Sequence, residues 1–344
     1  MEAALFYGVE DMRMDDIDAP EPGPGEILVD VAACGICGSD LHFYEHGLHG
    51  DVDYPVVLGH EVGGTVVELG EGVDSIDVGT DVVLSPHTPC MECWACENAL
   101  YNLCENLNAT SARPGGYAEQ VVETAENAIP LPDGVSPEDA AIAQPVGVGL
   151  HAVRTSPLGL GDSAAVFGTG PIGLGAVQFA NSVGAGPIFV SEPNDSRREI
   201  ASEFGADVLI DPTEEDPVER IREETGHGVD VSFEAVGLEV TLRQAIDSTG
   251  PAGHTTVIGV FQGDIDFNPQ ALVQRQRSLA GSTSHQLGPA VHKEYDVVLR
   301  QLESGELDPE KYVTSRIPLS NVIDDGFGAL LDEDSEERKI LVCP

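Results

Sequence analysis

One short stretch of the chain carries side chains that could bind a metal and move a proton. Residues 34–40 read CGICGSD, which places two cysteines, a hydroxyl and a carboxylate within seven positions. A Cys-x-x-Cys pair is typical of a redox dithiol, of half of a four-thiolate zinc site, or of one metal ligand beside a spectator cysteine. The stretch alone leaves these alternatives open, so the other chemistry-bearing residues have to distinguish them.

Four more cysteines follow the spacing C-x2-C-x2-C-x7-C and are Cys90, Cys93, Cys96 and Cys104. Four thiolates leave no open coordination position, so this pattern predicts a closed tetrahedral zinc site that stabilises a loop and performs no chemistry. We call residues 86–105 the zinc lobe. The alternative is buried or disulfide-bonded cysteines, but the odd total of seven cysteines disfavours a paired disulfide framework.

A second, open metal site is predicted from Cys37, His60, Glu61 and Gln144. A thiolate and an imidazole with an exchangeable position beside them are typical of catalytic zinc. His60 and Glu61 follow the apolar run VVLG, so we expect the pair to be partly buried. Asp40 is the expected acceptor for the other ring N–H of His60. His60 alone would be interpreted as a core histidine, whereas His60 together with Cys37 favours the metal.

A glycine-rich stretch in the middle of the chain matches the dinucleotide fingerprint G-x-G-x-x-G. The predicted cofactor-binding residues are Gly168, Gly170, Pro171, Ile172 and Gly173. The stretch lies between a predicted strand and a predicted helix, as the fingerprint requires. The first glycine allows the tight turn, the second allows a pyrophosphate to approach the backbone, and the third allows close helix packing. A ligand-free glycine turn is the disfavoured alternative.

An acidic residue stands nineteen positions beyond the fingerprint, at Glu192. At the end of the next strand, such a carboxylate can accept both hydroxyls of an adenosine ribose and repels a 2′-phosphate. The sequence therefore favours NAD over NADP. Two nearby arginines leave NADP open as the cofactor: Arg197, which is predicted to belong to the same site, and Arg198.

These residues must be positioned by two kinds of structure. The first third contains short β-type runs at 27–33, 62–69 and 81–84, which predict a mostly β part. From about residue 163, short apolar strands alternate with amphipathic helices. Six strands are predicted at 164–167, 188–191, 208–210, 231–233, 255–260 and 279–282, with helices at 197–204, 218–224 and 240–248. This alternation predicts a doubly wound parallel sheet in an α/β protein.

The junction between the two parts is predicted from a helix-start signal. In Ser136-Pro137-Glu138-Asp139, Ser136 is the expected N-cap, Pro137 the first helical residue, and Asp139 the residue that returns the cap bond. Pro145 is expected to interrupt this helix. A helix near 291–303 and strands near 313–317 and 339–342 are expected to fold back onto the first part. The predicted domains are therefore 1–145 with 285–344, and 146–284.

Composition disfavours several classes of partner. The chain of 344 residues holds 60 Asp plus Glu against 16 Lys plus Arg, a net charge of −44. Such a surface repels phosphate backbones and anionic lipid, which disfavours nucleic acid, including a zinc-ribbon role, and membranes. The acidic residues are spread along the whole chain, which favours adaptation to a salt-rich cytoplasm. The absence of a stretch of eighteen apolar residues also favours a cytoplasmic protein.

Taken together, these motifs resemble the zinc-dependent medium-chain alcohol dehydrogenases over essentially the whole chain. The stretches Cys37–His42 and Gly59–Glu61, the zinc lobe and the Gly168–Gly173 fingerprint occur in that family's order and approximate spacing. Within the family, Ile188–Pro193 and Phe233–Gly237 look most like the 2,3-butanediol dehydrogenase branch, with sorbitol and threonine dehydrogenases close behind.

The resemblance implies a GroES-like, mostly β catalytic domain, a Rossmann domain and two zinc ions per chain. It implies that Cys37 is the catalytic zinc ligand and that Cys34 binds no metal. Glu61 would be a ligand or near-ligand that exchanges with water, and Ser39 and His42 would form a proton relay through the cofactor ribose. Gln144 departs from the family, whose polyol and butanediol branches usually place a glutamate there.

The expected reaction is hydride transfer between NAD and a secondary alcohol, vicinal diol or polyol, with 2,3-butanediol and acetoin as the first choice. Sorbitol, threonine and glucose are the alternatives. Val236, Val260 and Ser282 are the expected walls of the nicotinamide pocket. We expect a homo-oligomer, a dimer or homotetramer, in which residues 255–261 could pair across a two-fold axis. A silent nucleotide-binding or redox-sensing protein is the alternative of another class.

Overall fold

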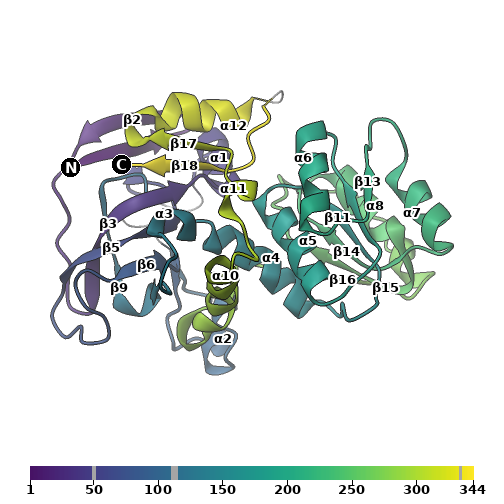
Figure 1. The fold of residues 1–344 in the computed structure, drawn as a ribbon, viewed down its shortest axis with the longest axis horizontal. Coiled ribbons are helices and arrows are strands. Elements are labelled where there is room, and N and C mark those ends of the chain that lie inside the picture. Colours follow the sequence, from purple (N-terminus) through teal and green to yellow (C-terminus); the bar gives the residue numbers. More distant parts are fainter. Residues whose placement is uncertain (49–51, 110–114, 333–334) are drawn as a thin grey trace. The chain divides into compact units, whose positions relative to one another are not determined.

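The computed structural model describes residues 1–48, 52–109, 115–332 and 335–344. It divides into two compact units (Figure 1). Unit 1 comprises Met1–Gln144 and Gln286–Pro344, and unit 2 comprises Pro145–His285. Among the described residues, no helix is both long and apolar enough to cross a membrane.

Unit 1 is built on a seven-stranded sheet. Its strand order is β10-β6-β5-β3-β18-β17, and β9 also pairs with β3. The strands are β3 (Glu26–Gly35), β5 (Glu61–Leu69), β6 (Asp81–Leu84), β9 (Gln120–Thr124), β10 (Ala128–Pro130), β17 (Ser315–Pro318) and β18 (Ile340–Cys343). A second sheet, in the order β2-β1-β4, contains β1 (Glu2–Gly8), β2 (Asp11–Asp16) and β4 (Val56–Val57). The three strands predicted in the first third are therefore present as β3, β5 and β6.

The C-terminal segment returns to this sheet, as predicted. Strand β18 pairs antiparallel with β3, opposite Cys34 and Gly35, and parallel with β17. The yellow C-terminal strand accordingly lies beside the purple β3 in Figure 1. This pairing brings the residue just before β18, Lys339, next to the chemistry-bearing stretch 34–40.

Helix α1 (Gly38–His46) follows β3 directly, with Cys37 as its N-cap residue. The zinc lobe contains the short elements β7 (His87–Thr88), α2 (Trp94–Glu97) and the 3₁₀ turn η1 (Tyr101–Leu103), and β7 pairs with β8 (Asn108–Ala109), which follows the lobe. The other helices in the described part of unit 1 are η3 (Ala125–Asn127), α3 (Pro137–Ala140), η5 (Gly288–Ala290), α10 (His292–Ser304), α11 (Pro309–Tyr312), η6 (Leu319–Asn321), the π-helix η7 (Val322–Gly328) and α12 (Ala329–Leu331).

The start of α3 follows its sequence signal, and α3 ends at Ala140, before Pro145. The Ser136 hydroxyl oxygen accepts the Asp139 N–H at 3.1 Å and donates its own proton to the Asp139 carboxylate at 2.7 Å. Pro145, however, is the third residue of the next helix, α4 (Ala143–Thr155). Because the first N–H groups of a helix have no intrahelical partner, proline is tolerated there.

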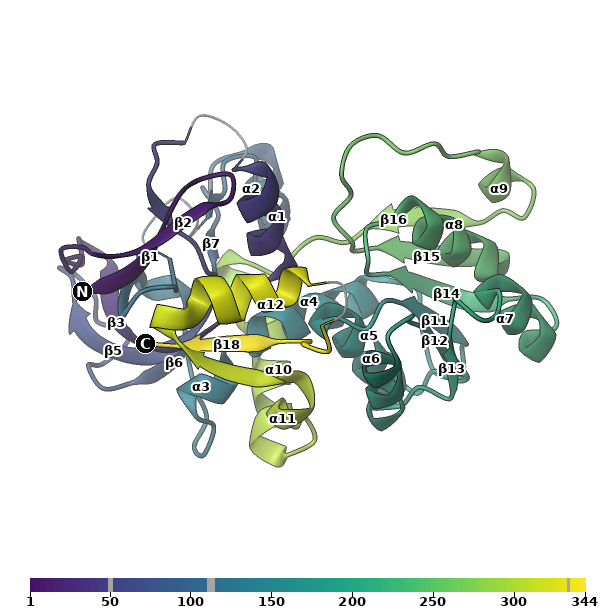
Figure 2. The same cartoon turned by 90° about the horizontal axis from the view of Figure 1, so that it is seen from above.

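Unit 2 contains the predicted parallel sheet. Six strands pair in the order β13-β12-β11-β14-β15-β16, all in parallel, and Figure 2 shows them in this sequence. They are β11 (Ala164–Phe167), β12 (Ile188–Ser191), β13 (Val208–Ile210), β14 (Val229–Glu234), β15 (Thr249–Val257) and β16 (Ser278–Gly281). The α/β Rossmann architecture is thus confirmed, although β15 ends at Val257 and leaves Val260 in the following loop.

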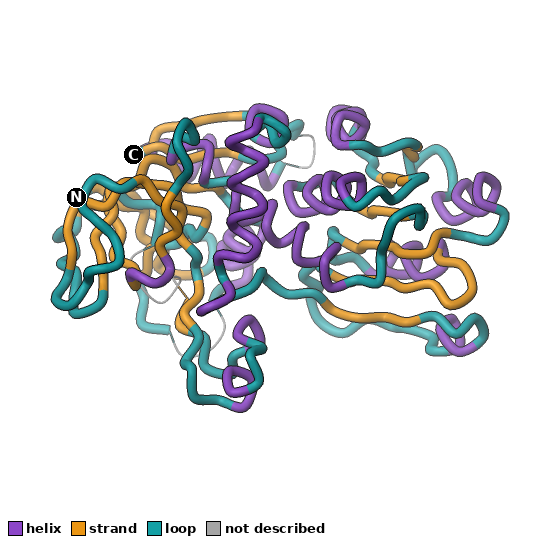
Figure 3. The backbone as a smooth tube through the Cα atoms, turned by 60° about the horizontal axis from the view of Figure 1, so that its bottom comes forward, coloured by secondary structure: helices purple, strands orange, loops and turns teal. Residues whose placement is uncertain are grey.

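Helices and turns connect these strands, and Figure 3 shows them in purple around the orange strands. They are α5 (Pro171–Ser182), α6 (Asp195–Ile200), η4 (Ala201–Phe204), α7 (Pro217–Thr225), α8 (Glu239–Ser248) and α9 (Gln270–Val273). The core strands β11 and β12 are buried over their whole length, as expected for parallel strands covered on both faces.

Candidate active site

Three of the predicted metal-binding side chains converge in unit 1. The ligand atoms of Cys37, His60 and Glu61 all lie within 4.8 Å of one another. Cys37 comes from the turn between β3 and α1, and Glu61 begins β5 opposite Gly35 of β3. A thiolate, an imidazole and a carboxylate match the donor types that zinc prefers, and three donors leave an open position. The residues present therefore fit a catalytic zinc ion.

Asp40 fixes the orientation of His60, as the sequence predicted. Its carboxylate lies 3.4 Å from the Nδ1 of His60, which leaves Nε2 as the ring nitrogen for a metal. The same carboxylate accepts the Cys37 N–H at 3.0 Å and the Tyr117 hydroxyl at 2.7 Å. Burial alone would raise the pKa of Asp40, but the His60 charge and these hydrogen bonds lower it overall. Asp40 is therefore a carboxylate anchored from three sides.

Tyr117 is a site residue that the sequence reasoning missed. Its side chain is fully buried, and besides Asp40 it reaches the Gly35 carbonyl at 3.3 Å. Gly59, at φ +96°, passes so close that an added Cβ would lie 3.0 Å from the Tyr117 ring. The tyrosine thus packs against the loop between β4 and β5 that carries His60.

Lys339 is the second missed residue, and it engages Glu61. Its Nζ lies 2.6 and 2.8 Å from the two Glu61 oxygens and donates to the Ile36 carbonyl at 2.6 Å. Lys339 is 2% exposed and Glu61 is fully buried. A buried charge requires a partner, so Glu61 is shared between the lysine and the metal-binding cluster. The one available signal was scarcity, because the chain holds only three lysines.

Cys34 lies outside the cluster. It is fully buried, its thiol donates to its own neighbour, the Gly35 carbonyl, at 3.6 Å, and burial raises its pKa well above the ordinary value. Neither Cys34 nor Cys37 forms a disulfide. These features describe an inert core cysteine rather than half of a redox pair.

The other predicted catalytic residues lie on two helices of the chain. Ser39 and His42 are in the first turns of α1, and the His42 ring lies 4.9 Å from the ring of His46 one turn later. Gln144 is the second residue of α4 and is 5% exposed.

The four cysteines of the zinc lobe converge as predicted. The Sγ atoms of Cys90, Cys93, Cys96 and Cys104 all lie within 4.8 Å of one another. Backbone N–H groups point at the sulfurs, with the Cys90 N–H donating to Cys104 at 3.2 Å. Hydrogen bonds from the backbone N–H groups of Cys96 and Glu105 lower the pKa of Cys93 to about 6, whereas burial raises the pKa of Cys96 to about 12. Four converging sulfurs with N–H donors fit a closed zinc site.

In unit 2, the glycine fingerprint forms the turn between β11 and α5. Gly168 has φ +91°, a conformation that favours glycine. A Cβ added at Gly173 would lie 2.1 Å from the Gly168 carbonyl oxygen, whereas one added at Gly170 would meet open space. Pro171 and Ile172 open α5, whose first N–H groups are the kind that bind phosphates.

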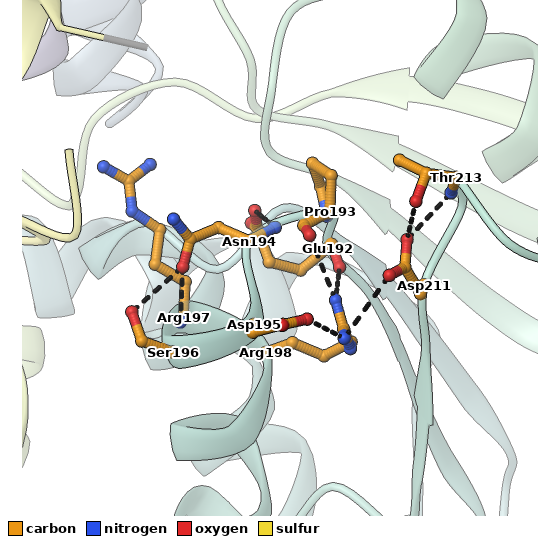
Figure 4. Close-up of polar contacts among 9 residues, drawn as sticks. All are labelled: Glu192, Pro193, Asn194, Asp195, Ser196, Arg197, Arg198, Asp211 and Thr213. Carbon is orange, nitrogen blue, oxygen red and sulfur yellow. Dashed lines mark hydrogen bonds and ion pairs between the residues drawn. The ribbon is translucent and has the colours of Figure 1, made fainter. Parts of the chain in front are cut away.

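Glu192 follows β12 and is 7% exposed. Beside it, Arg198 donates to the carbonyls of Glu192 at 2.8 Å and Pro193 at 3.1 Å, pairs with Asp195, and lies 3.5 Å from the Asp211 carboxylate. Figure 4 shows Arg198 enclosed by these groups, while the guanidinium of Arg197 points away from them. Arg198 is therefore engaged in the structure of the turn, and Arg197 is the arginine directed elsewhere.

The expected nicotinamide walls lie beyond the ends of β14, β15 and β16. Val236 and Val260 are 41% and 63% exposed, and the Ser282 N–H donates to the Val257 carbonyl at 2.8 Å. Sequence reasoning missed Glu234, a fully buried carboxylate at the end of β14. One of its oxygens accepts the N–H groups of Val236 and Gly237 and the Thr241 hydroxyl, at 2.7 to 3.0 Å. Glu234 therefore fixes the loop that carries Val236.

Two protein families match this chain. Residues 23–133 match the alcohol dehydrogenase GroES-like domain, and residues 171–304 match the zinc-binding dehydrogenase family.

Full-length relatives and solved structures agree with these matches. The (R,R)-butanediol dehydrogenase of Bacillus subtilis (strain 168) is 38% identical, and the alignment covers all of both chains. The L-threonine 3-dehydrogenase of Pyrococcus abyssi is 37% identical over 92% of this chain and 90% of its own. The crystal structure of the Bacillus subtilis 2R,3R-butanediol dehydrogenase superposes with a TM-score of 0.90 over 100% of this chain and 99% of the other.

A zinc-binding dehydrogenase from Sinorhizobium meliloti 1021, described as bound to NADP, also superposes with a TM-score of 0.90, at 32% identity, over 100% of this chain and 99% of its own. The same family is indicated by the two matching domains, by the full-length relatives and by both clusters of metal-binding side chains. The chain belongs to the zinc-binding medium-chain alcohol dehydrogenase family and is an oxidoreductase.

Proposed function

We propose that the protein oxidises a secondary alcohol or vicinal diol with NAD, or reduces the matching ketone, and that its substrate pair is 2,3-butanediol and acetoin. The observation that carries this proposal is the open cluster of Cys37, His60 and Glu61 in a chain that aligns end to end with a butanediol dehydrogenase. L-threonine is the second candidate, because the threonine dehydrogenase of Pyrococcus abyssi is nearly as similar.

The catalytic zinc would be held by Cys37 and His60, with Glu61 and Gln144 as the third and fourth candidates. When bound, the metal polarises the substrate oxygen and NAD exchanges the hydride. Asp40 holds the His60 ring in the tautomer that exposes Nε2. Lys339 holds the Glu61 carboxylate, which limits the negative charge available at the metal. Ser39 takes the proton of the substrate hydroxyl and passes it toward His42, and both residues stand on α1 directly behind Cys37.

For the cofactor, we propose NAD rather than NADP. The support is the carboxylate of Glu192 at the end of β12, where a 2′-phosphate would meet a negative charge. Arg197 was predicted to bind the cofactor at the same place, but its guanidinium points away from Glu192 in Figure 4. The relative described with NADP is one reason to measure both cofactors.

We also propose two zinc ions per chain, one catalytic and one structural in the zinc lobe, with unit 1 as the catalytic domain and unit 2 as the NAD-binding domain. The net charge of −44 and the seven unpaired cysteines support a salt-rich, reducing cytoplasm. A homo-oligomer, a dimer or homotetramer, completes the proposal.

The test is NAD and NADP reduction in molar KCl with the zinc-loaded enzyme. The substrates are the butanediol stereoisomers, L-threonine, sorbitol, glucose and simple secondary alcohols. We expect a butanediol stereoisomer with NAD to give the highest kcat/KM. A higher kcat/KM with L-threonine would show that L-threonine, the second candidate, is the better substrate. Faster turnover with NADP would overturn the cofactor assignment.

A further inference from the structure

The Glu192 carboxylate is held by the glycine fingerprint itself. Its Oε2 accepts two hydrogen bonds from Thr169, one from the backbone N–H at 3.0 Å and one from the hydroxyl at 2.9 Å. Its Oε1 accepts the Asn194 N–H at 3.1 Å. Thr169 is fully buried and Glu192 is 7% exposed, so these hydrogen bonds are shielded from water.

The number of these hydrogen bonds limits what Glu192 can accept from a ligand. An ionised carboxylate offers about four acceptor positions, two on each oxygen. Thr169 donates twice to Oε2, whereas Asn194 donates once to Oε1, so Oε1 is the less occupied oxygen and the better placed to accept a ribose hydroxyl.

We infer that Thr169 is a specificity-determining positioning residue for the cofactor. Its hydroxyl fixes the negative charge of Glu192 beside the adenosine ribose, so that a 2′-phosphate meets a carboxylate that cannot turn away. This inference rests on the proposed NAD preference and deepens it.

Different groups hold the backbone and the side chain of Glu192, so a mutation can loosen the side chain alone. The backbone is held separately, because Arg198 binds the Glu192 carbonyl and pairs with Asp195 and Asp211. The positive charge of Arg198 is thus engaged by two carboxylates and does not offset the charge of Glu192 toward a phosphate. Among the described residues, only the Thr169 hydroxyl donates to the Glu192 carboxylate from a side chain, and mutation can remove this hydrogen bond without altering the backbone.

A matched pair of variants separates the hydroxyl from the methyl group of Thr169. Thr169→Val keeps the shape and removes the hydroxyl, whereas Thr169→Ser keeps the hydroxyl. Dissociation constants for NADH and NADPH are measured by fluorescence titration of the zinc-loaded full-length enzyme in molar KCl. We expect the ratio of the NADPH to the NADH dissociation constant to fall about tenfold in Thr169→Val, as for one lost hydrogen bond to a charged group, and to change less than about twofold in Thr169→Ser.

The outcomes distinguish this inference from the NAD proposal. If wild-type enzyme prefers NADH and Thr169→Val leaves the ratio unchanged, or if Ser and Val lower it equally, the inference is wrong and the NAD preference stands. If wild-type enzyme binds NADPH as tightly as NADH, both are wrong. A thermal melt checks that each variant is folded, and Thr169→Ala replaces Thr169→Val if the latter is not.

Discussion

At the scale of single residues, the buried pair of Lys339 and Glu61 is the feature that most distinguishes this site from its sequence motif. The chain holds only three lysines, and one of them, Lys339, is 2% exposed. Its Nζ lies 2.6 Å from an oxygen of Glu61, a candidate metal ligand. Removing one member of a buried ion pair leaves the other charge without compensation.

We therefore expect Lys339→Met to lower the free energy of unfolding by about 3–5 kcal/mol, measured by denaturant unfolding in molar KCl. The control is Lys293→Met, the same substitution at an exposed lysine, with an expected change within about 0.5 kcal/mol. Equal effects of the two substitutions would show that the buried pair contributes nothing specific.

Gln144 gives a second prediction at this scale. A carboxamide oxygen brings no charge to a cation, so Gln144→Glu should slow the loss of the catalytic zinc to a chelator. Release of the ion proposed for the zinc lobe, with four thiolate ligands, should keep its rate and serves as the internal control. If the release rates of both ions are unchanged, Gln144 is not a zinc ligand.

The sequence predicted those site residues that act with close neighbours in the chain. Asp40 was predicted as the partner of His60 because a carboxylate in this motif can accept the second ring N–H of a metal-binding histidine. Tyr117 and Lys339 were missed because they lie 77 positions from Asp40 and 278 positions from Glu61. Lys339 reaches Glu61 only when β18 pairs with β3, and Tyr117 reaches Asp40 only when its backbone bonds to Ala4 and Leu58. Single-residue types carry no sign of such a register.

At the scale of elements, two glycines in the turn between β11 and α5 have different roles, one in stability and one in cofactor binding. Gly173→Ala would place a Cβ 2.1 Å from the Gly168 carbonyl, whereas Gly170 faces open space and has φ −61°, which alanine adopts. We expect Gly173→Ala to cost about 1–3 kcal/mol of stability. Gly170→Ala should leave stability within about 0.5 kcal/mol but weaken NADH binding, because its methyl occupies the approach of the pyrophosphate.

Unfolding curves and NADH titrations of both variants check this prediction. Loss of stability in Gly170→Ala, or normal NADH binding by that variant, would contradict the different roles given to the two glycines.

The parallel strands were the elements most readily predicted, because each is a short apolar run bounded by turn residues. Strands β11 and β12 begin and end at their predicted residues. The helix that begins at Pro137 does end before Pro145, but Pro145 itself lies in the first turn of α4, where proline is tolerated. The end of β15 was mispredicted because the run 255–260 continues past the last paired residue of its strand.

At the scale of the whole molecule, the net charge of −44 should make stability depend on salt. At 1 M salt, charges farther apart than about 3 Å are screened, so repulsion among the carboxylates is suppressed. We expect the melting temperature to rise steadily from dilute buffer to molar KCl. A melting temperature that does not respond to KCl would show that the acidic surface is not a salt adaptation.

The central claim is that the chain binds two zinc ions at chemically different sites, one open at Cys37, His60 and Glu61 and one closed in the zinc lobe. Zinc content per chain, measured by elemental analysis, tests it most directly. We predict about two zinc ions for the wild type and for Cys34→Ala, and about one for Cys37→Ser. One zinc ion in the wild type, or equal contents in Cys34→Ala and Cys37→Ser, would contradict the account.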